Sequence, residues 1–251
     1  MTLLEALLVL VAGVWAGAIN TLVGSGSLVT FPVLLAVGYP PLTANVSNNL
    51  GLVPGAVSGA YGFRRELRGQ RGRILRFAPA SVIGGVTGAV LLLALPSSVF
   101  DAIVPVFVAV GLVLVVLQPH INRWLASRRR ADADEHSAPA LLATGITGVY
   151  GGYFGAAQGI LLLAVLGIAI DDELQRVNAL KVVLAGLVNF VAAVVFVAAA
   201  HIAWGAVALI AVGSTIGGQL GARVGRRLPA PALRAVIVVV GLAAIAKLLL
   251  D

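Results

Sequence analysis

The sequence predicts an all-α, polytopic membrane protein made of two inverted repeats, each with four long helices and one short broken or re-entrant segment. Three observations lead to this fold class. The composition is apolar, since 60% of the 251 residues are hydrophobic and only 11% are charged, about half the charged share of soluble domains. Apolar stretches of membrane-spanning length recur along the chain, and the second half repeats the pattern of the first. Unpaired backbone groups cannot face lipid, so such stretches must be helices.

We expect at least eight long helices, because each of eight apolar stretches approaches the roughly 20 residues that a helix needs to cross the hydrocarbon core. These stretches are residues 3–23, 42–63, 77–95, 99–117, 138–157, 174–199, 202–222 and 231–250. The first is expected to be a retained helix and not a signal peptide, since no Lys or Arg precedes it and Glu5 stands where a basic region belongs. The chain is interpreted as one membrane domain (1–251) with a first repeat (1–117), a cytoplasmic linker (118–137) and a second repeat (138–251).

The repeat is visible in a Ser-x-x-Gly-Gly-x-x-Gly pattern that occurs at residues 81–88 and again at 214–221, a displacement of 133 residues. The same displacement carries Gly26 onto Gly159 and Asn45 onto Asn178. Such internal similarity indicates a duplicated structural unit, which in membrane proteins most often builds a transporter. The small residues of the pattern themselves favour close helix crossing.

Basic residues indicate that the two repeats have opposite orientations. The Arg cluster at residues 64–76 follows the second long stretch of the first repeat, whereas the cluster at 223–234 comes one helix later in the second repeat. Positive loops remain on the cytoplasmic side. Placing both clusters, Arg176 and the linker arginines there leaves only Lys181 and Lys247 of the 17 Lys and Arg residues elsewhere. We therefore expect inverted repeats with both termini outside, and no nucleic-acid partner for the basic chain.

Inversion requires an odd number of crossings per repeat, so a short element must join the four long helices. The apolar runs 28–37 and 160–170 fit this role. At about 1.5 Å per residue each covers about half of the ~30 Å core. Each run is either a broken crossing or a re-entrant hairpin, and the sequence allows both.

Each short run follows an interruption that is rich in small residues. Glycine interrupts a helix and leaves polar main-chain groups that are tolerated at depth only where they line an enclosed cavity. Paired interruptions in two halves point to a transporter's binding site, and a half-helix that begins there favours an anion through its N–H groups and dipole. Close helix packing is the alternative explanation. The residues expected to bind are Gly24, Ser25, Gly26 and Ser27 in the first repeat, with Gln158 and Gly159 in the second.

The long stretch after each interruption carries a second polar group. Helical spacing places Asn45 with Asn48 and Asn49 on one face, and Asn178 with Lys181 on another. Lys181 is the one Lys or Arg well inside an apolar stretch. An intramembrane charge is a functional candidate that can neutralise an anion; alternatively, its long stem extends to the membrane interface. We add these five residues to the predicted binding site.

The chain resembles the TauE/SafE (sulfite exporter, TSUP) family of membrane transporters. In the first half the resemblance rests on Gly13-x3-Gly17, Gly24-Ser25-Gly26-Ser27, Pro32 and Pro40-Pro41, and in the second on His201-x2-Trp204, Gly213-Ser214-x2-Gly217-Gly218-x2-Gly221-Ala222 and Arg226-Arg227-Leu228-Pro229. Family members more usually carry glycines where Ser25 and Ser27 stand. The resemblance implies transport of sulfur-containing anions, such as sulfite, sulfonates or sulfoacetate, across the bacterial cytoplasmic membrane.

Catalysis is not expected. The chain has no cysteine, and its ten carboxylates lie in predicted loops or near helix ends, without metal-ligand spacing. We therefore predict no cofactor and no metal, and as partners a small anion and the lipid bilayer. The first functional hypothesis is an anion carrier with alternating access between the inverted repeats. A channel-like anion pore is the second, and a non-transporting membrane scaffold is the third.

Overall fold

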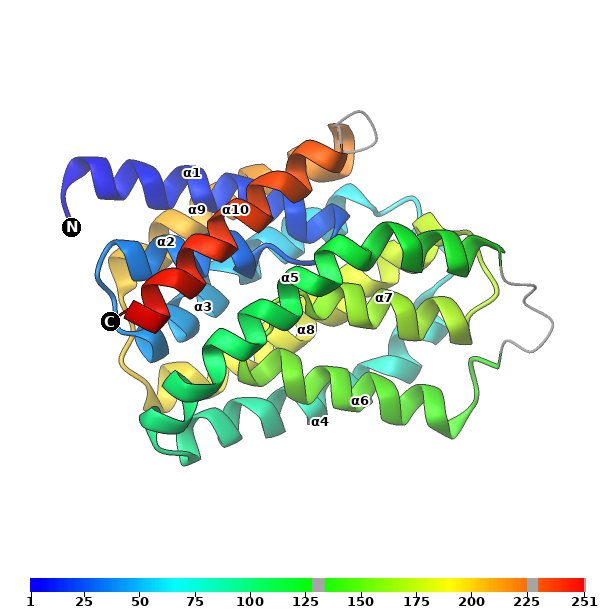
Figure 1. Ribbon diagram of the computed structural model, residues 1–251. Helices are drawn as coiled ribbons and strands as arrows, with labels where there is room; N and C mark the ends of the chain where they lie inside the picture. The colour runs from blue at the N-terminus through cyan, green and yellow to red at the C-terminus, as the bar shows by residue number, and fades with distance from the viewer. Residues whose placement is uncertain (128–133, 225–229, 251) are drawn as a thin grey trace.

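A computed structural model describes residues 1–127, 134–224 and 230–250, and within these ranges all regular secondary structure is helical (Figure 1). The helices are α1 (Leu3–Leu22), α2 (Ser27–Ala36), α3 (Pro41–Gly62), α4 (Arg71–Ala94), α5 (Ser97–Ser127), α6 (Ala138–Tyr153), α7 (Gln158–Ala169), α8 (Leu174–Ala199), α9 (Trp204–Val224) and α10 (Ala230–Leu250). The all-α class predicted from composition is confirmed.

Five helices of the described residues are long and apolar enough to cross a membrane, namely α1, α4, α5, α8 and α9. Helix α3 has 22 residues but carries a run of buried polar side chains, Asn45, Ser47, Asn48 and Asn49. Helix α6 has only 16 residues, because the chain leaves the helix at Phe154 instead of continuing to residue 157 as expected. The remaining expected helix, α10, has 21 residues but is not among the five. The protein is therefore a polytopic membrane protein in which three of the eight expected long helices fall outside this group.

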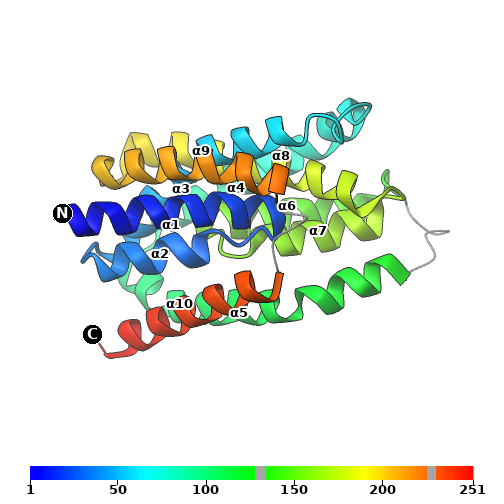
Figure 2. The same ribbon diagram turned by 90° about the horizontal axis from the view of Figure 1, so that it is seen from above.

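Corresponding helices of the two halves run in opposite directions along the bundle. In Figure 1, α1 runs from left to right and α6 from right to left, and the same reversal relates α3 to α8, α4 to α9 and α5 to α10. The packing follows the same correspondence, because α1 packs on α9 as α6 packs on α4, while α3 contacts α8 and α5 contacts α10. Both chain ends lie at one end of the bundle, and the α3–α4 connection lies at the other (Figure 2).

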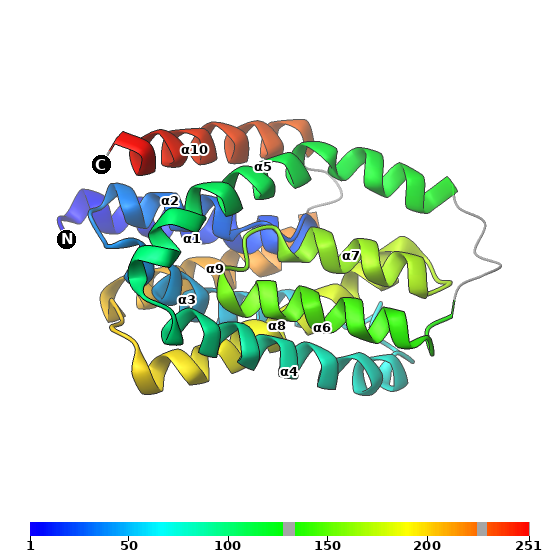
Figure 3. The same cartoon turned by 60° about the horizontal axis from the view of Figure 1, so that its bottom comes forward.

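The two short helices fold back beside the helices that precede them. Helix α2 returns along α1 toward the end at which α1 begins, and α7 returns along α6 in the same way (Figures 2 and 3). Of the two alternatives that the sequence allows, the structure thus has the hairpin. The turns of both hairpins lie inside the bundle, where the N–H of Gly159 donates a hydrogen bond of 3.0 Å to the carbonyl oxygen of Gly24.

The repeated glycine pattern serves helix packing, as its small-residue spacing predicts. A Cβ at Gly84 or Gly88 of α4 would collide with the α6 backbone, and a Cβ at Gly217 or Gly221 of α9 would collide with the α1 backbone. The absence of side chains there lets each pair of helices approach backbone to backbone. The two hairpins are thereby held against α4 and α9.

Helix α5 extends beyond the boundary expected for the first repeat. It continues to Ser127 instead of ending near residue 117, so that much of the interval taken as linker is helical. One face of its last turns packs inside the bundle, where Leu125 is buried beside Gly167 of α7, while Arg123, Trp124 and Ser127 are exposed. The remaining linker arginines, Arg128, Arg129 and Arg130, and the cluster members Arg226 and Arg227 fall outside the described residues.

Candidate functional site

The two hairpin turns share one left-handed position, and the second turn has another at Gly155 (φ +77°). Gly24 has φ +87° and Ala157, which is 133 residues further along, has φ +60°. Left-handed φ is strained for alanine and unstrained for glycine. At Gly24 a side chain is also excluded by space, because a Cβ there would overlap the backbone of Gly159. The turns therefore meet backbone to backbone near the middle of the bundle.

Two equivalent asparagines each hold the hairpin of the other half. The Asn45 side chain on α3 donates from Nδ2 to the carbonyl oxygen of Tyr153 at 3.0 Å, at the end of α6. The Asn178 side chain on α8 donates from Nδ2 to the carbonyl oxygen of Thr21 at 3.2 Å, near the end of α1. The last carbonyls of a helix lack intrahelical partners, so both asparagines satisfy backbone groups that the breaks leave free.

A second polar cluster holds the start of α2. The N–H of Gly26 donates to Oδ1 of Asn20 at 2.7 Å. Asn48 on α3 donates from Nδ2 to the Ser27 hydroxyl at 3.1 Å, and its Oδ1 accepts a short hydrogen bond from the Thr30 hydroxyl. Both ends of the Asn48 amide are thus committed to the first turn of α2.

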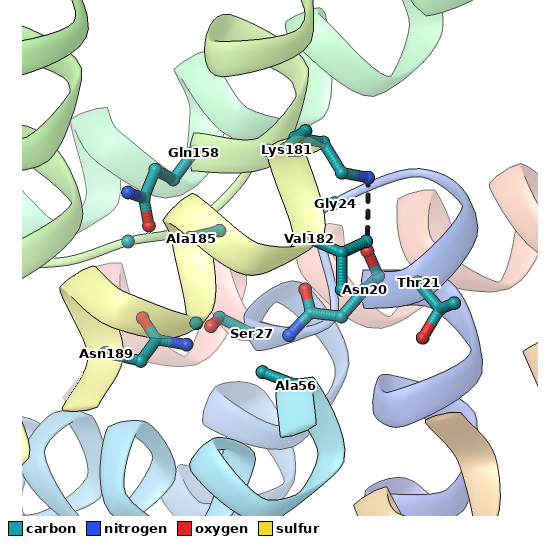
Figure 4. A pocket seen from close by; sticks show the side chains of 13 residues that line it. Asn20, Thr21, Gly24, Ser27, Ala56, Gln158, Lys181, Val182, Ala185 and Asn189 are labelled. Atoms are coloured by element: carbon teal, nitrogen blue, oxygen red, sulfur yellow. Dashed lines mark hydrogen bonds between the residues drawn. The ribbon is translucent and has the colours of Figure 1, made fainter. Parts of the chain in front are cut away.

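Between the turns and α8 lies a small polar cavity of about 30 Å³, enough for one or two water molecules. Figure 4 shows Lys181 extending from α8 toward the end of α1, while Asn189 and Ser27 point toward one another. The lining residues of α8 recur at helical spacing and form one face. The cavity is lined by Asn20, Thr21, Gly24, Ser27, Ala56, Gly155, Gln158, Gly159, Lys181, Val182, Ala185, Gly186 and Asn189.

Lys181 supplies the charge of this cavity. Its side chain is 1% exposed, and Nζ donates to the carbonyl oxygen of Asn20 at 3.3 Å. Within the described residues no carboxylate lies at ion-pair distance from Nζ, and the other side chains that line the cavity are uncharged. The amino group is therefore inside the bundle and does not extend to the membrane interface, and Lys181 is the lining residue that can bring a positive charge to the cavity.

The structure brings five of the predicted residues to the cavity and places six around it. Gly24, Ser27, Gln158, Gly159 and Lys181 line it. Behind the lining lie Ser25, Gly26, Asn45, Asn48, Asn49 and Asn178, of which Asn49 reaches the cavity residue Asn189 through a side-chain hydrogen bond of 3.5 Å.

The start of α7 differs from the expected row of free amides. The N–H groups of Gln158, Gly159 and Ile160 donate to carbonyl oxygens at 3.2, 3.0 and 3.0 Å. What this turn offers a ligand is the Gln158 side chain, whose Nε2 is buried and has no hydrogen-bond partner among the described residues. The prediction of free backbone amides at the start of α7 is therefore wrong, and the free donor at this turn belongs to a side chain.

Sequence reasoning missed Asn20 and Asn189. Asn189 stands eight residues after Lys181, which is the same face of a helix, and this spacing was available as a signal. Asn20 has no comparable signal, because it meets Lys181 through a contact between α1 and α8 that spans 161 positions of the sequence. Ala56 occupies the position equivalent to Asn189, so this amide has no counterpart in the first half.

An ion-pair network ties the bundle at the end opposite to the termini. Arg73 at the start of α4 contacts Glu135 at 2.7 Å and Asp172 at 2.5 Å, and Arg176 of α8 contacts the same Asp172 at 3.0 Å. Partial burial acts to raise the pKa of Asp172, but hydrogen bonds from Arg176 and Arg73 outweigh it and hold this pKa below its ordinary value. The network joins α4 to the α7–α8 connection.

In this helical membrane bundle two broken hairpins enclose a polar cavity. This arrangement is typical of membrane transporters. The family model described as sulfite exporter TauE/SafE matches residues 9–248, and the chain belongs to this family. It is a membrane transporter.

Curated relatives carry names of the same kind. The "Probable membrane transporter protein YfcA" of Escherichia coli (strain K12) is 28% identical over 94% of this chain and 86% of its own length. The "Probable membrane transporter protein ORF9" of a Sinorhizobium species is 28% identical over 96% of this chain and 91% of its own. A "Probable membrane transporter protein" of Haemophilus influenzae is 25% identical over 95% and 92%. No solved structure was found to match the chain.

Proposed function

We propose that the protein transports small sulfur-containing anions, such as sulfite, sulfonates or sulfoacetate, through the cavity at which its two hairpins meet. The observation that carries this proposal is the buried Lys181 ammonium, which has no carboxylate partner among the described residues and is surrounded by neutral polar groups. A buried charge requires a partner, and an anionic substrate supplies one. The family description as a sulfite exporter supports the choice of sulfur oxyanions.

The chemistry of the lining suits such a group. An ammonium has three donors, and Lys181 uses one of them on Asn20. The amide of Gln158 has an unpartnered Nε2, and the amide of Asn189 and the hydroxyl of Ser27 line the same cavity. Sulfite and sulfonate oxygens accept hydrogen bonds from several directions, so convergent neutral donors beside one cation would hold them.

The proposed mechanism is alternating access between two inverted repeats. It is supported by the opposite directions of corresponding helices and by the matching contacts of α1 with α9 and of α6 with α4. The cavity has room for only one or two water molecules, so the hairpins must separate to admit a sulfonate. Separation of the turns would break the hydrogen bond between Gly159 and Gly24, and the bonds of Asn45 and Asn178 to the opposite hairpins would have to break or follow the movement.

The proposed location is the bacterial cytoplasmic membrane, with both termini outside. Arg64, Arg68 and Arg73 lie at or beside the α3–α4 connection, and Arg176 lies near them through its bond to the Arg68 carbonyl. This end of the bundle is opposite to the two chain ends (Figure 2). Positive loops favour the cytoplasmic side, which supports the placement of the termini on the other side.

Flux into proteoliposomes tests the proposal. Vesicles containing purified protein should take up radiolabelled sulfite and methanesulfonate with saturation, and unlabelled anion inside should accelerate uptake by counter-transport. Current that rises linearly with voltage and does not saturate would instead favour the pore. Lys181→Ala protein that folds and retains full flux would contradict the placement of the anion beside Lys181, whereas a folded wild type without flux would favour the scaffold. A folded wild type that moves none of the anions would contradict anion transport altogether.

A further inference from the structure

We propose that Lys181 carries a proton together with the anion, so that the protein moves one proton with each singly charged anion. The inference rests on the proposed function and extends it to the coupling ion. In the loaded state the ammonium pairs with the anion. In the empty state the amine is neutral. The proton is taken from water on the loading side and is returned to water on the releasing side, and no other reactant is needed.

The immediate surroundings of Nζ explain why the charge depends on the ligand. Nζ is buried, and its single described hydrogen bond is to the neutral carbonyl of Asn20 at 3.3 Å. An isolated buried ammonium loses most of its hydration, and one carbonyl does not replace it. An anion in the cavity stabilises the ammonium by direct electrostatic attraction. Binding of the anion and binding of the proton therefore favour each other, which is the linkage that a symporter requires.

No other group facing Lys181 can take over the proton. Helix α8 packs against α1, α3, α4, α6 and α7. These helices contribute to the cavity only amides, hydroxyls, glycines and aliphatic groups. Of their titratable groups outside the cavity, the Tyr150 hydroxyl donates to the carbonyl of Ala156 and the Tyr153 ring lies against Phe100 and Phe107. The remaining titratable residues of these helices stand near helix ends. They are Glu5, Tyr61, Arg71, Arg73 and Arg76, with Arg176 on α8 itself, and both Arg73 and Arg176 bind Asp172.

Comparison of Lys181 with the equivalent residue of the first half shows that helix packing does not require a charged side chain at this position. The position equivalent to Lys181 is Asn48, a displacement of 133 residues. Asn48 is also buried, but both ends of its amide are bonded to α2. A neutral side chain therefore meets the structural demands of this position in the first half. The charge in the second half is single, so one bound monoanion makes the loaded site neutral.

The test uses methanesulfonate, which remains a monoanion throughout the neutral range, so that any response to pH belongs to the protein. Proteoliposomes hold equal labelled methanesulfonate on both sides, the membrane voltage is clamped at zero with potassium and valinomycin, and the outside is made one pH unit more acidic. One-to-one coupling predicts accumulation inside that approaches about tenfold.

The matched variant is Lys181→Arg, because a guanidinium keeps its proton under all these conditions. Whatever exchange of methanesulfonate it retains, it should accumulate none in response to the pH gradient. Wild-type exchange without accumulation would overturn the proton inference and leave anion transport standing, as would accumulation that survives in Lys181→Arg. If the arginine variant does not fold, the presence or absence of methanesulfonate accumulation by the wild type decides whether transport is coupled to protons. Failure to exchange methanesulfonate also overturns the inference, and failure to exchange sulfite as well overturns the proposed function.

Discussion

The backbone N–H of Gly159 donates a hydrogen bond of 3.0 Å to the carbonyl oxygen of Gly24, and this bond joins the two broken hairpins where they meet. The residues stand 135 positions apart in sequence. Their contact brings the starts of α2 and α7 to one place beside Lys181, where both turns line the cavity.

Substitution of Gly24 tests the close approach. Gly24→Ala should destabilise the protein far more than Gly38→Ala, as measured by the apparent melting temperature in detergent. Both glycines have positive φ, +87° and +96°, but a Cβ at Gly38 meets no atom within 4 Å whereas one at Gly24 overlaps Gly159. Gly38→Ala should therefore cost only the conformational strain, about 1 kcal/mol. Equal melting temperatures for the two variants would show that the turns do not touch.

Ala157 carries strain that Ala156 does not. Both side chains are fully buried, and among the described non-glycine residues only Ala157 has positive φ. Replacement of either alanine by glycine loses a buried methyl, about 0.8 kcal/mol, but at Ala157 the relief of strain offsets this loss. We expect Ala157→Gly to melt close to the wild type and Ala156→Gly to melt lower. The reverse order would contradict the left-handed turn.

Substitution of Asn178 should affect the stability of the protein, whereas substitution of Asn189 should affect its affinity for sulfite. Asn178→Ala removes the donor from the carbonyl of Thr21 and leaves a buried acceptor unpaired, at a cost of about 1–3 kcal/mol. It should lower the melting temperature with little change in the KM for sulfite. Asn189→Ala should raise KM and leave the melting temperature nearly unchanged, because its one described hydrogen bond is long, at 3.5 Å. An Asn178→Ala variant that is stable but binds sulfite weakly would make Asn178 a ligand instead.

The network around Asp172 predicts a dependence of stability on pH. The pKa of Asp172 is lowered in the folded state. Its contribution to the free energy of unfolding is therefore present at neutral pH and is lost as the pH falls through this lowered pKa. Asp172→Asn should melt below the wild type at pH 7, and the difference should narrow as the pH falls below about 4. The exposed Asp101 offers a control, since Asp101→Asn should shift melting little at any pH. If the difference in melting temperature stays constant with pH, the ionised Asp172 carboxylate does not stabilise the fold.

Much of the fold was predictable, because its determinants are local. Paired glycine interruptions and the Gly-Gly patterns of α4 and α9 mark turns and close crossings wherever they occur, and the polar side chains that follow each break indicate where the two halves face one another. The partners of those side chains were not predictable. Asn45 and Asn178 bind backbone carbonyls of the opposite half, and this depends on how far each hairpin folds back, which no local spacing records. Asn20 was missed because its contact with Lys181 is likewise distant in sequence.

Equilibrium binding of sulfite to purified protein tests the central claim most directly, with Lys181→Met compared against Arg71→Met. Arg71 is exposed at the start of α4, so Arg71→Met removes one positive charge without touching the cavity. The account predicts saturable binding by the wild type and Arg71→Met, and its loss in a folded Lys181→Met protein. Equal binding by the two variants would contradict the assignment of the anion to the cavity between the hairpins.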